Sequence, residues 1–207
     1  MRALVRPPSS RLAEGLVTHI DRSPIDLELA RRQWHEYVTA LAAAGWQTIE
    51  VPAAEDHPDA VFVEDTVVMF GDTAVITRPG AEQRAGETTG TAASLRELGL
   101  PVLEMLIGQL DGGDVLKVGD RVYVGRGGRT DAAGLAEFRR LVEPLGHSVI
   151  GVPLTKVLHL KSAVTALPDG TIIGYPNSWT IPDSSRTSGR CPRKPVPMWS
   201  TWVRAGC

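Results

Sequence analysis

Cysteines, aromatic residues and long apolar runs are scarce in this 207-residue chain. It contains only Cys191 and Cys207, and 5% of its residues are Phe, Trp or Tyr. Two cysteines are too few for a disulfide framework, and their spacing is not that of a zinc site. No apolar run approaches the roughly 20 residues that cross a bilayer, and the first residues do not form a secretion signal. We therefore expect a cytoplasmic protein without a membrane partner.

The chain also lacks a strong excess of either charge. Its formal net charge is -2 and its pI is near 6.2, so it has no basic surface suited to nucleic acid. A phosphate-binding loop, a dinucleotide-binding glycine pattern and a serine nucleophile elbow are absent as well. What is present is 43% hydrophobic residues, enough for the core of one or two domains.

A hairpin pattern occurs three times. The segments VVMFGDTAVITRPG, VLKVGDRVYVGRGG and VTALPDGTIIGYP each place a turn signal between two apolar stretches. The turns fall at Gly71-Asp72, Gly119-Asp120 and Asp169-Gly170, at spacings of 48 and 50 residues. A fixed period of this size predicts a repeat protein whose units stack linearly or in a ring.

Each of the first two hairpins is followed by a helical pattern and another strand. The pattern predicts a helix over 87–98 with a strand from 101, and a helix over 130–145 with a strand from 148. Thr130 is the expected cap of the second helix. An incomplete N-terminal copy has a helix started by Ser23 and Pro24 and ended by Gly45, followed by a strand from Thr48. The predicted unit is thus hairpin, helix, strand.

The last segment, 177–207, differs in composition from the rest. It has three of the five Trp, both Cys and a net charge of +4, and it shows no strand or helix period. Composition alone favours a disordered tail. A frameshift is the sharper hypothesis, because a GC-rich back-translation read in another frame gives a peptide with normal apolar alternation. Resequencing the gene across codon 176 tests it, and an unbroken frame would contradict it.

Polar side chains stand before each hairpin, within apolar sequence. They are Asp59, Glu64 and Asp65 before the first, Asp111 and Asp114 before the second, and His159 before the third. Burying such groups without partners is costly. If equivalent strand starts meet near a common axis, these side chains form an acidic pocket with one imidazole.

Each of these residues also has a purely structural interpretation. Glu64 and Asp65 could end a strand facing solvent, Asp111 could belong to a plain Gly-rich turn, and His159 could be a core histidine. Arg78 and Arg129 could be surface arginines rather than carboxylate-binding ones. A metal site is the competing use of clustered acids, but no two histidines stand at ligand spacing around them.

The motifs VFVED, ITRPGA, LDGGDVL, GGRTDAAG and VLHLKS, in this order and spacing, resemble the dimethylarginine dimethylaminohydrolase family. The resemblance runs from about Leu4 to Tyr175. It implies an α/β fold of the pentein type, a five-bladed propeller of ββαβ repeats, here incomplete because the last blade and part of the preceding one are missing. It also implies hydrolysis of asymmetric dimethylarginine or monomethylarginine to citrulline and an amine, without a metal or other cofactor.

The resemblance also assigns roles to individual residues. His159 resembles the general acid that protonates the departing amine and then activates water, and Asp111 the carboxylate that flanks the guanidino group and the histidine. The residues that resemble the substrate-binding ones are Asp65 for the guanidino nitrogens, Arg78 and Arg129 for the substrate carboxylate, Asp59 and Glu64 in the pocket, and Leu16 in a closing N-terminal loop. The expected partner is thus a methylated arginine, and a homodimer is compatible with the sequence.

The chain departs from this family in its last segment. The family's nucleophilic cysteine lies beyond the fifth blade, and neither Cys191 nor Cys207 sits in a matching motif. We therefore divide the chain into a partial propeller domain, 1–176, and an aberrant tail, 177–207, and expect the chain as written to be inactive. The alternatives are an arginine deiminase or amidinotransferase relative, and a non-catalytic arginine-binding remnant.

Overall fold

The computed structural model describes residues 1–18, 21–174 and 201–204, the last four by their backbone only. The chain divides into two compact units, Met1–Leu106 and Ile107–Cys207. The predicted domain boundary at 176/177 lies outside the described residues, and it stays a prediction. Within 177–207 the structure describes one strand, β11 (Thr201–Arg204).

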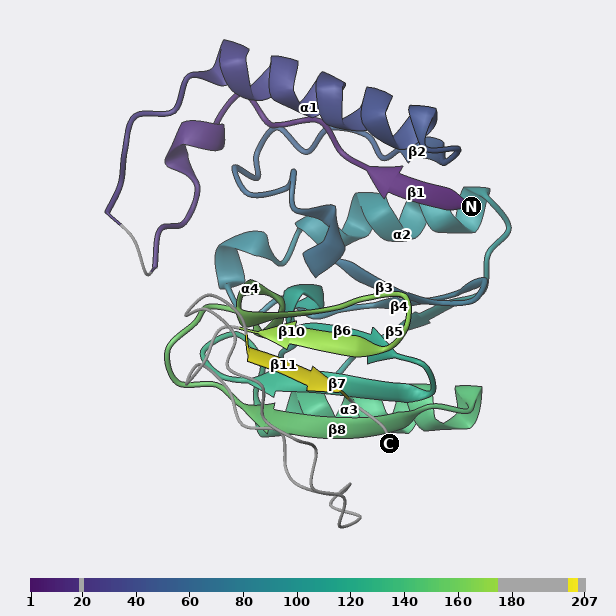
Figure 1. Ribbon diagram of the computed structural model, residues 1–207. Helices are drawn as coiled ribbons and strands as arrows, with labels where there is room; N and C mark the ends of the chain where they lie inside the picture. The colour runs from purple at the N-terminus through teal and green to yellow at the C-terminus, as the bar shows by residue number, and fades with distance from the viewer. Residues whose placement is uncertain (19–20, 175–200, 205–207) are drawn as a thin grey trace. The chain divides into compact units, whose positions relative to one another are not determined.

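The first unit contains a two-stranded and a three-stranded sheet (Figure 1). The chain begins with β1, which pairs in parallel with β2, the strand that follows helix α1 in the sequence. The second sheet has the order β3-β4-β5, antiparallel in the hairpin and parallel at its last strand. The elements are β1 (Arg2–Val5), α1 (Leu27–Ala43), β2 (Gln47–Glu50), β3 (Val67–Phe70), β4 (Thr73–Ile76), α2 (Glu87–Glu97) and β5 (Val102–Glu104), with 3-10 turns η1 (Leu12–Glu14), η2 (Val63–Asp65) and η3 (Glu82–Arg84).

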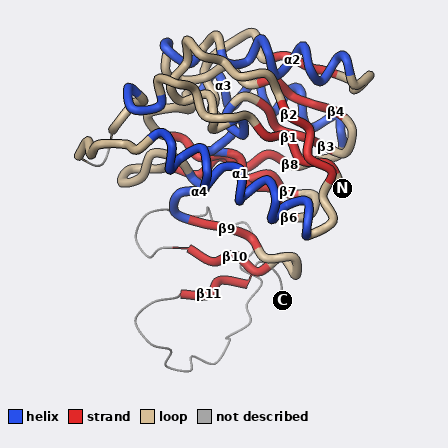
Figure 2. The backbone as a smooth tube through the Cα atoms, turned by 90° about the horizontal axis from the view of Figure 1, so that it is seen from above, coloured by secondary structure: helices blue, strands red, loops and turns tan. Residues whose placement is uncertain are grey.

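The second unit contains two three-stranded sheets. Its first sheet has the order β6-β7-β8, with an antiparallel hairpin and a parallel third strand. Its second sheet has the order β9-β10-β11, and all of its strands are antiparallel (Figure 2). The elements are η4 (Gly112–Asp114), β6 (Val115–Val118), β7 (Arg121–Arg126), α3 (Ala132–Val142), η5 (Glu143–Leu145), β8 (Ser148–Pro153), α4 (Leu160–Ala163), β9 (Val164–Ala166) and β10 (Thr171–Gly174).

The predicted repeat is present in the structure. The first two hairpins, β3-β4 and β6-β7, turn at Gly71 and Gly119, whose φ angles of 58° and 62° favour glycine. Each is followed by a helix and a parallel strand, α2 with β5 and α3 with β8. The hairpin β9-β10 closes around the predicted Asp169-Gly170 turn. The N-terminal copy is incomplete, as expected, because β1 and β2 pair without a preceding hairpin strand.

The starts of two helices differ from the sequence expectation. Helix α1 begins at Leu27, and Asp26 caps it by accepting the Leu29 N–H, so Ser23 and Pro24 precede the helix. Helix α3 is capped by Asp131, which accepts the Gly134 N–H at 2.6 Å. Because aspartate and threonine are both favoured N-cap residues, the sequence alone does not show which of two neighbouring residues, such as Thr130 and Asp131, caps the helix.

Each unit has a separate apolar cluster that fixes its sheets. In the first unit, helix α2 packs Ala92 and Leu95 against Val67, Ala74 and Ile76 of the β3-β4 hairpin. The cluster of the second unit joins its two sheets through α4 and consists of Leu116, Tyr123, Val152, Leu154, Leu160, Ala163, Val164 and Ile172. Because Leu160 is 1% exposed, the residue next to it, His159, is held in place by this core.

Candidate active site

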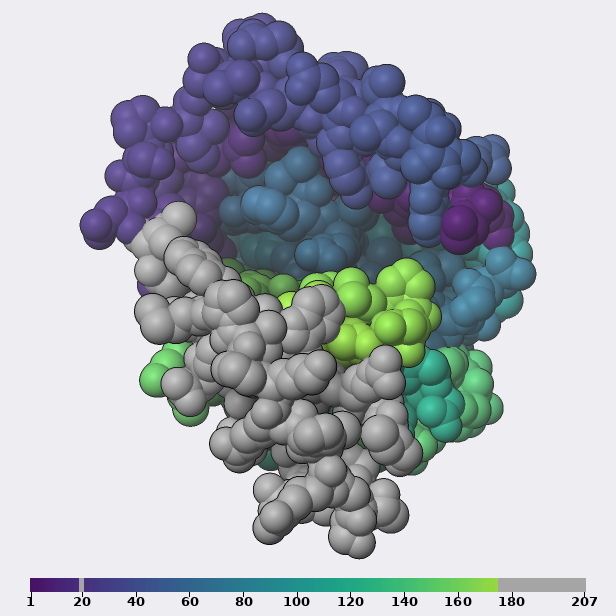
Figure 3. All heavy atoms as spheres, viewed as in Figure 1, coloured from purple at the N-terminus to yellow at the C-terminus, as the bar shows by residue number. Residues whose placement is uncertain are grey.

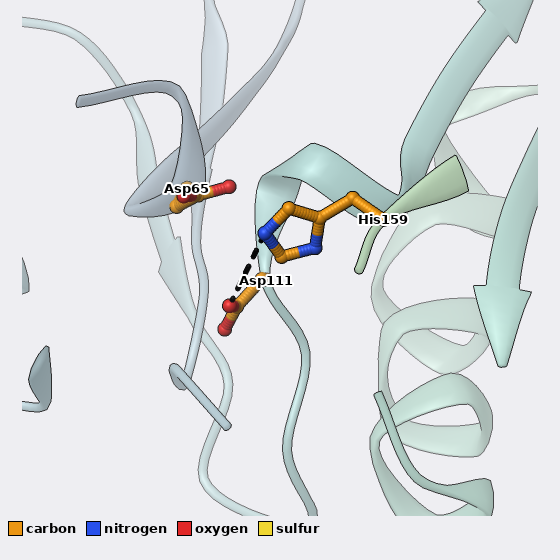
Figure 4. A group of neighbouring side chains, drawn as sticks. All are labelled: Asp65, Asp111 and His159. Carbon is orange, nitrogen blue, oxygen red and sulfur yellow. Dashed lines mark ion pairs between the residues drawn. The ribbon is translucent and has the colours of Figure 1, made fainter. Parts of the chain in front are cut away.

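His159 lies at the N-cap of α4, with extended backbone angles of -133° and 156°. Its side chain is 12% exposed, so the ring is neither on the surface nor fully in the core. Its Nε2 atom lies 3.8 Å from Oδ2 of Asp111 (Figure 4), and its Nδ1 atom lies 3.7 Å from Oδ1 of Asp114. The imidazole therefore stands between two carboxylates of the same unit.

Asp111 is fully buried, directly before η4. Its Oδ2 atom lies 3.6 Å from Nη1 of Arg129, whose side chain is 11% exposed. The backbone before Asp111 is held by the start of α3, because Asp131 also accepts the Gln109 N–H. A Cβ on Gly134 would lie 2.0 Å from the Gln109 carbonyl oxygen, so this close approach requires glycine. The second unit thus brings together Asp111, Arg129 and His159, three of the predicted site residues.

Asp114, at the end of η4, faces Nδ1 of the ring. It is also fully buried, and both of its oxygens accept hydrogen bonds. Oδ2 accepts from the Thr130 hydroxyl at 2.6 Å, and Oδ1 accepts from the Leu160 N–H at 2.9 Å. Both Asp114 oxygens are therefore held by donors of the same unit.

Asp65 occupies the corresponding place in the first unit, at the end of η2. Its carboxylate is buried and forms an ion pair with Arg84, with Oδ2 and Nη1 2.7 Å apart. Arg84 also donates two hydrogen bonds to Glu87, at 2.9 and 2.8 Å. This buried arginine, held between two acids, was not predicted from the sequence.

The charges around Arg84 keep its guanidinium ionised. Burial acts against the charge, but the hydrogen bond to Glu87 and the charges of Asp65 and Glu87 outweigh it, so the pKa of Arg84 is raised. Arg6, 1% exposed, donates to the Glu87 carbonyl and to the Thr91 hydroxyl. Burial lowers the pKa of Arg6, while the charge of Glu87 opposes that effect. The first unit therefore contains a dense, internally matched charge network.

The other predicted residues of the first unit lie around this network in different settings. Asp59 and Leu16 are in contact, because both carboxylate oxygens of Asp59 accept the Leu16 N–H, at 3.2 and 3.0 Å. Glu64 is exposed and lines a cavity of about 340 Å³ with Arg6, Trp34 and Tyr37. The space-filling view shows the surface hollowed beneath α1 (Figure 3). Arg78 is exposed just after β4.

The sequence interpretation did not identify Arg84, and it expected Asp114 in the acidic pocket without giving it a role. Arg84 lies 19 residues after Asp65, and no local pattern links them. Asp114 was recognised as a buried-acid candidate, but its contact with Leu160, 46 residues away, depends on the packing of α4.

The chain is similar in sequence to curated dimethylarginine dimethylaminohydrolases. It is 61% identical over 175 residues to the enzyme of Streptomyces coelicolor, covering 84% of this chain and 68% of that protein. The chain belongs to the dimethylarginine dimethylaminohydrolase family. A second member, from Pseudomonas aeruginosa, is 34% identical over 172 residues, covering 82% of this chain and 67% of that protein. No family model matches the chain.

Solved structures of this family have the same fold. A dimethylarginine dimethylaminohydrolase from Pseudomonas aeruginosa, a cysteine-to-serine variant complexed with citrulline, matches with a TM-score of 0.76 and 36% identity, over 80% of this chain and 66% of that one. The N-terminal domain of a cyanobacterial arginine dihydrolase matches with a TM-score of 0.77 at 23% identity, over 86% of this chain and 68% of that one, which shows the fold alone. These matches confirm the predicted α/β pentein-type fold. The chain spans about two thirds of the length of these relatives.

Among the described residues, no helix is long and apolar enough to cross a bilayer. The roles of the predicted site residues stay predictions, because the structure contains only the protein. The second unit places a carboxylate opposite each ring nitrogen of His159. An imidazole can hold a proton at either nitrogen, so this arrangement is suited to proton transfer.

Proposed function

We propose that the protein binds methylated arginines and takes part in their hydrolysis to citrulline and an amine. The observation that carries this proposal is the placement of His159, in a family member, between the buried carboxylates of Asp111 and Asp114. An imidazole in this setting is suited to proton transfer, and a guanidino carbon cannot lose an amine unless that amine is protonated.

In the proposed reaction, His159 gives its proton to the departing amine and then accepts one from the attacking water. Asp111 faces Nε2 of His159 and stabilises positive charge on the ring and on a bound guanidinium. Arg129, 3.6 Å from Asp111, offers the planar donor set that a substrate carboxylate requires.

The remaining predicted substrate-binding residues belong to the first unit. Asp65 is proposed to bind guanidino nitrogens, and Asp59, Glu64 and Leu16 to form the pocket and its closing loop. Arg78 was predicted to bind the substrate carboxylate, but it is exposed, whereas Arg84 lies directly on Asp65. We therefore propose that Arg84 also contacts a ligand bound at Asp65, and Arg78 stays a proposed partner of the substrate carboxylate.

The chemistry also needs a nucleophile. A guanidinium is a poor electrophile, so a thiolate attacks the guanidino carbon and the resulting thiouronium is hydrolysed. Cys191 and Cys207 both lie outside the described residues, and neither matches the family's motif, so we assign the nucleophile to neither. We keep the hypothesis that a frameshift in 177–207 explains why neither cysteine matches the family's motif. We also propose that the enzyme is cytoplasmic, and that a homodimer is the assembly to test.

Citrulline formation tests the proposed function. A protein expressed from the gene with its frame restored after codon 176 is expected to release citrulline and dimethylamine in equal amounts from asymmetric dimethylarginine. Faster citrulline release from arginine than from methylated arginine would contradict the proposal and support a deiminase. The 207-residue chain is expected to release none, because losing a nucleophile from a cooperating set costs on the order of a millionfold. If this chain releases citrulline and the Cys207→Ser variant does not, the nucleophile is Cys207.

A further inference from the structure

Asp114 is a fully buried carboxylate that the proposed reaction does not use. It lies at the end of η4, three residues after Asp111, and is 0% exposed. A buried carboxylate is costly unless its oxygens accept hydrogen bonds. Here the partners are the Thr130 hydroxyl, at 2.6 Å from Oδ2, and the Leu160 N–H, at 2.9 Å from Oδ1.

The bond to Leu160 fixes the backbone that carries His159. Helix α4 is a single turn, and His159 at its N-cap makes no side-chain capping bond. Asp114 takes over that function from 46 residues away by accepting the N–H of the residue next to His159. The Cα of His159 is therefore tied to η4, the same turn that follows Asp111.

The same oxygen that holds Leu160 also faces the ring. Oδ1 of Asp114 lies 3.7 Å from Nδ1 of His159, beyond a direct hydrogen bond but close enough for a strong effect of charge in a buried site. Space for this oxygen is kept open by Gly125 of β7, since a Cβ there would lie 2.7 Å from it. Nε2, on the other side of the ring, faces Asp111 at 3.8 Å.

We propose that Asp114 is a positioning residue that keeps a proton on Nδ1 of His159, so that Nε2 is the nitrogen that exchanges protons with the substrate. Oδ1 of Asp114 is fixed opposite Nδ1 by its bond to the Leu160 N–H, so its negative charge favours N–H at that atom. Asp111, opposite Nε2, is the carboxylate proposed to face the bound guanidinium, which leaves Nε2 for proton exchange with the substrate. The significance for catalysis rests on the proposed function, while the effect on the histidine is a property of the protein alone.

Asp114→Asn separates charge from geometry. The amide oxygen can still accept the Leu160 N–H, and the amide NH₂ can donate to the Thr130 hydroxyl oxygen, which accepts as readily as it donates. Thr130→Val removes one hydrogen bond to Asp114 but keeps its charge, and Thr130→Ser keeps both. Asp26→Asn is a matched control, because Asp26 is a capping aspartate of the first unit.

The test is the ¹⁵N spectrum of the His159 ring in the 207-residue protein. The chain has five histidines, and loss of one signal pair in His159→Gln assigns it. We expect the neutral ring of the wild type to carry its proton on Nδ1. The Thr130→Ser, Thr130→Val and Asp26→Asn variants are expected to show the same tautomer. In Asp114→Asn the proton is expected to move to Nε2. A wild-type proton on Nε2, or an unchanged ring in Asp114→Asn, would overturn the proposal.

Turnover in the frame-restored protein provides the second measurement. Asp114→Asn is expected to lower kcat by up to about a hundredfold, the low end for loss of an acid-base group, with KM unchanged. A rise in KM alone would overturn the positioning role. If the wild type does not hydrolyse methylarginine but the tautomer changes in Asp114→Asn, the proposed function fails and the positioning of His159 stands.

Discussion

The two units place a buried aspartate at the same point of the repeat, before the first strand of a hairpin, and use it differently. Asp65 pairs with the guanidinium of Arg84 at 2.7 Å, inside a network that also holds Glu87. Asp114 instead accepts bonds from two neutral donors, Thr130 and Leu160. The repeat thus determines where a carboxylate is placed. The partners of that carboxylate determine whether it neutralises a buried positive charge or orients a neighbouring ring.

The charge pairs of the two units also differ in distance. In the first unit, the ion pairs of Arg84 are 2.7 and 2.8 Å long. In the second unit, the pairs of Asp111 with Arg129 and His159 are 3.6 and 3.8 Å long. We infer that the first network mainly stabilises its unit, while the second leaves its charged groups able to exchange a partner for a ligand.

Asp65→Ala is expected to have the largest effect on stability. It leaves the buried Arg84 without one of its two acids, and breaking a buried pair costs about 3 to 5 kcal/mol. Urea unfolding measures this loss in free energy. The control is Asp72→Ala, which removes an exposed pair with Arg2 and is expected to cost at most about 1 kcal/mol. Equal losses in both variants would contradict the comparison.

His159→Gln is expected to affect chemistry and leave stability nearly unchanged. Its ring lies at the edge of the core, and the charges around it are loosely spaced. In the frame-restored protein, turnover should fall by about a hundredfold or more because the leaving amine is no longer protonated. Normal turnover with a native circular dichroism spectrum would exclude the catalytic role, and an unfolded spectrum would identify His159 as a structural residue.

Gly125→Ala is expected to destabilise the second unit by about 1 to 3 kcal/mol, the usual cost of overpacking. The added methyl group would lie 2.5 Å from Leu154 Cδ1 and 2.7 Å from Asp114 Oδ1. Gly128→Ala is the matched control, because nothing lies within 4 Å of a Cβ there. Thermal unfolding of both variants measures the difference, and no loss in Gly125→Ala would show that Asp114 has room to move.

The smallest expected effect concerns the N-terminal loop. Hydrogen bonds from Ser10 to Glu55 lower the pKa of Glu55, which is exposed. A lowered carboxyl pKa contributes stability above the ordinary value of about 4.3, and that contribution is lost as the pH falls through the lowered pKa. Hydrogen exchange of the Ser10 amide should therefore quicken, relative to its intrinsic rate, at acid pH. Glu55→Ala should show fast exchange at neutral pH already, and slow exchange there would refute the contact.

The sequence predicted the elements of the repeat because their signals are local. The Gly71 and Gly119 turns need a positive φ, and the apolar spacing marks α2, α3 and the strands that follow. It did not predict that Asp131 rather than Thr130 caps α3. Thr130 is 2% exposed, and its hydroxyl donates to Asp114. Tertiary packing therefore determines which of the two neighbouring residues caps the helix.

The site was predictable in its residues and not in its contacts. Asp111 and His159 stand out in the sequence because apolar residues surround them, whereas Arg129, in GRGGRT, stands out only through the family motif. The pairing of Arg84 with Asp65 was missed, since charges 19 residues apart meet only through the fold. Arg78, which the resemblance assigns to the substrate carboxylate, is exposed just after β4.

Calorimetric titration of the 207-residue chain with asymmetric dimethylarginine tests the central claim most directly, because binding requires no nucleophile. We expect saturable heat with one molecule bound per chain, retained in His159→Gln and strongly weakened in Asp111→Asn, which removes the carboxylate charge from a fully buried position. The same titration with lysine, a cation without a guanidino group, should give no saturable heat. Absence of binding by the wild-type chain, or equal binding in Asp111→Asn, would contradict the proposal that this cluster receives a methylated guanidinium.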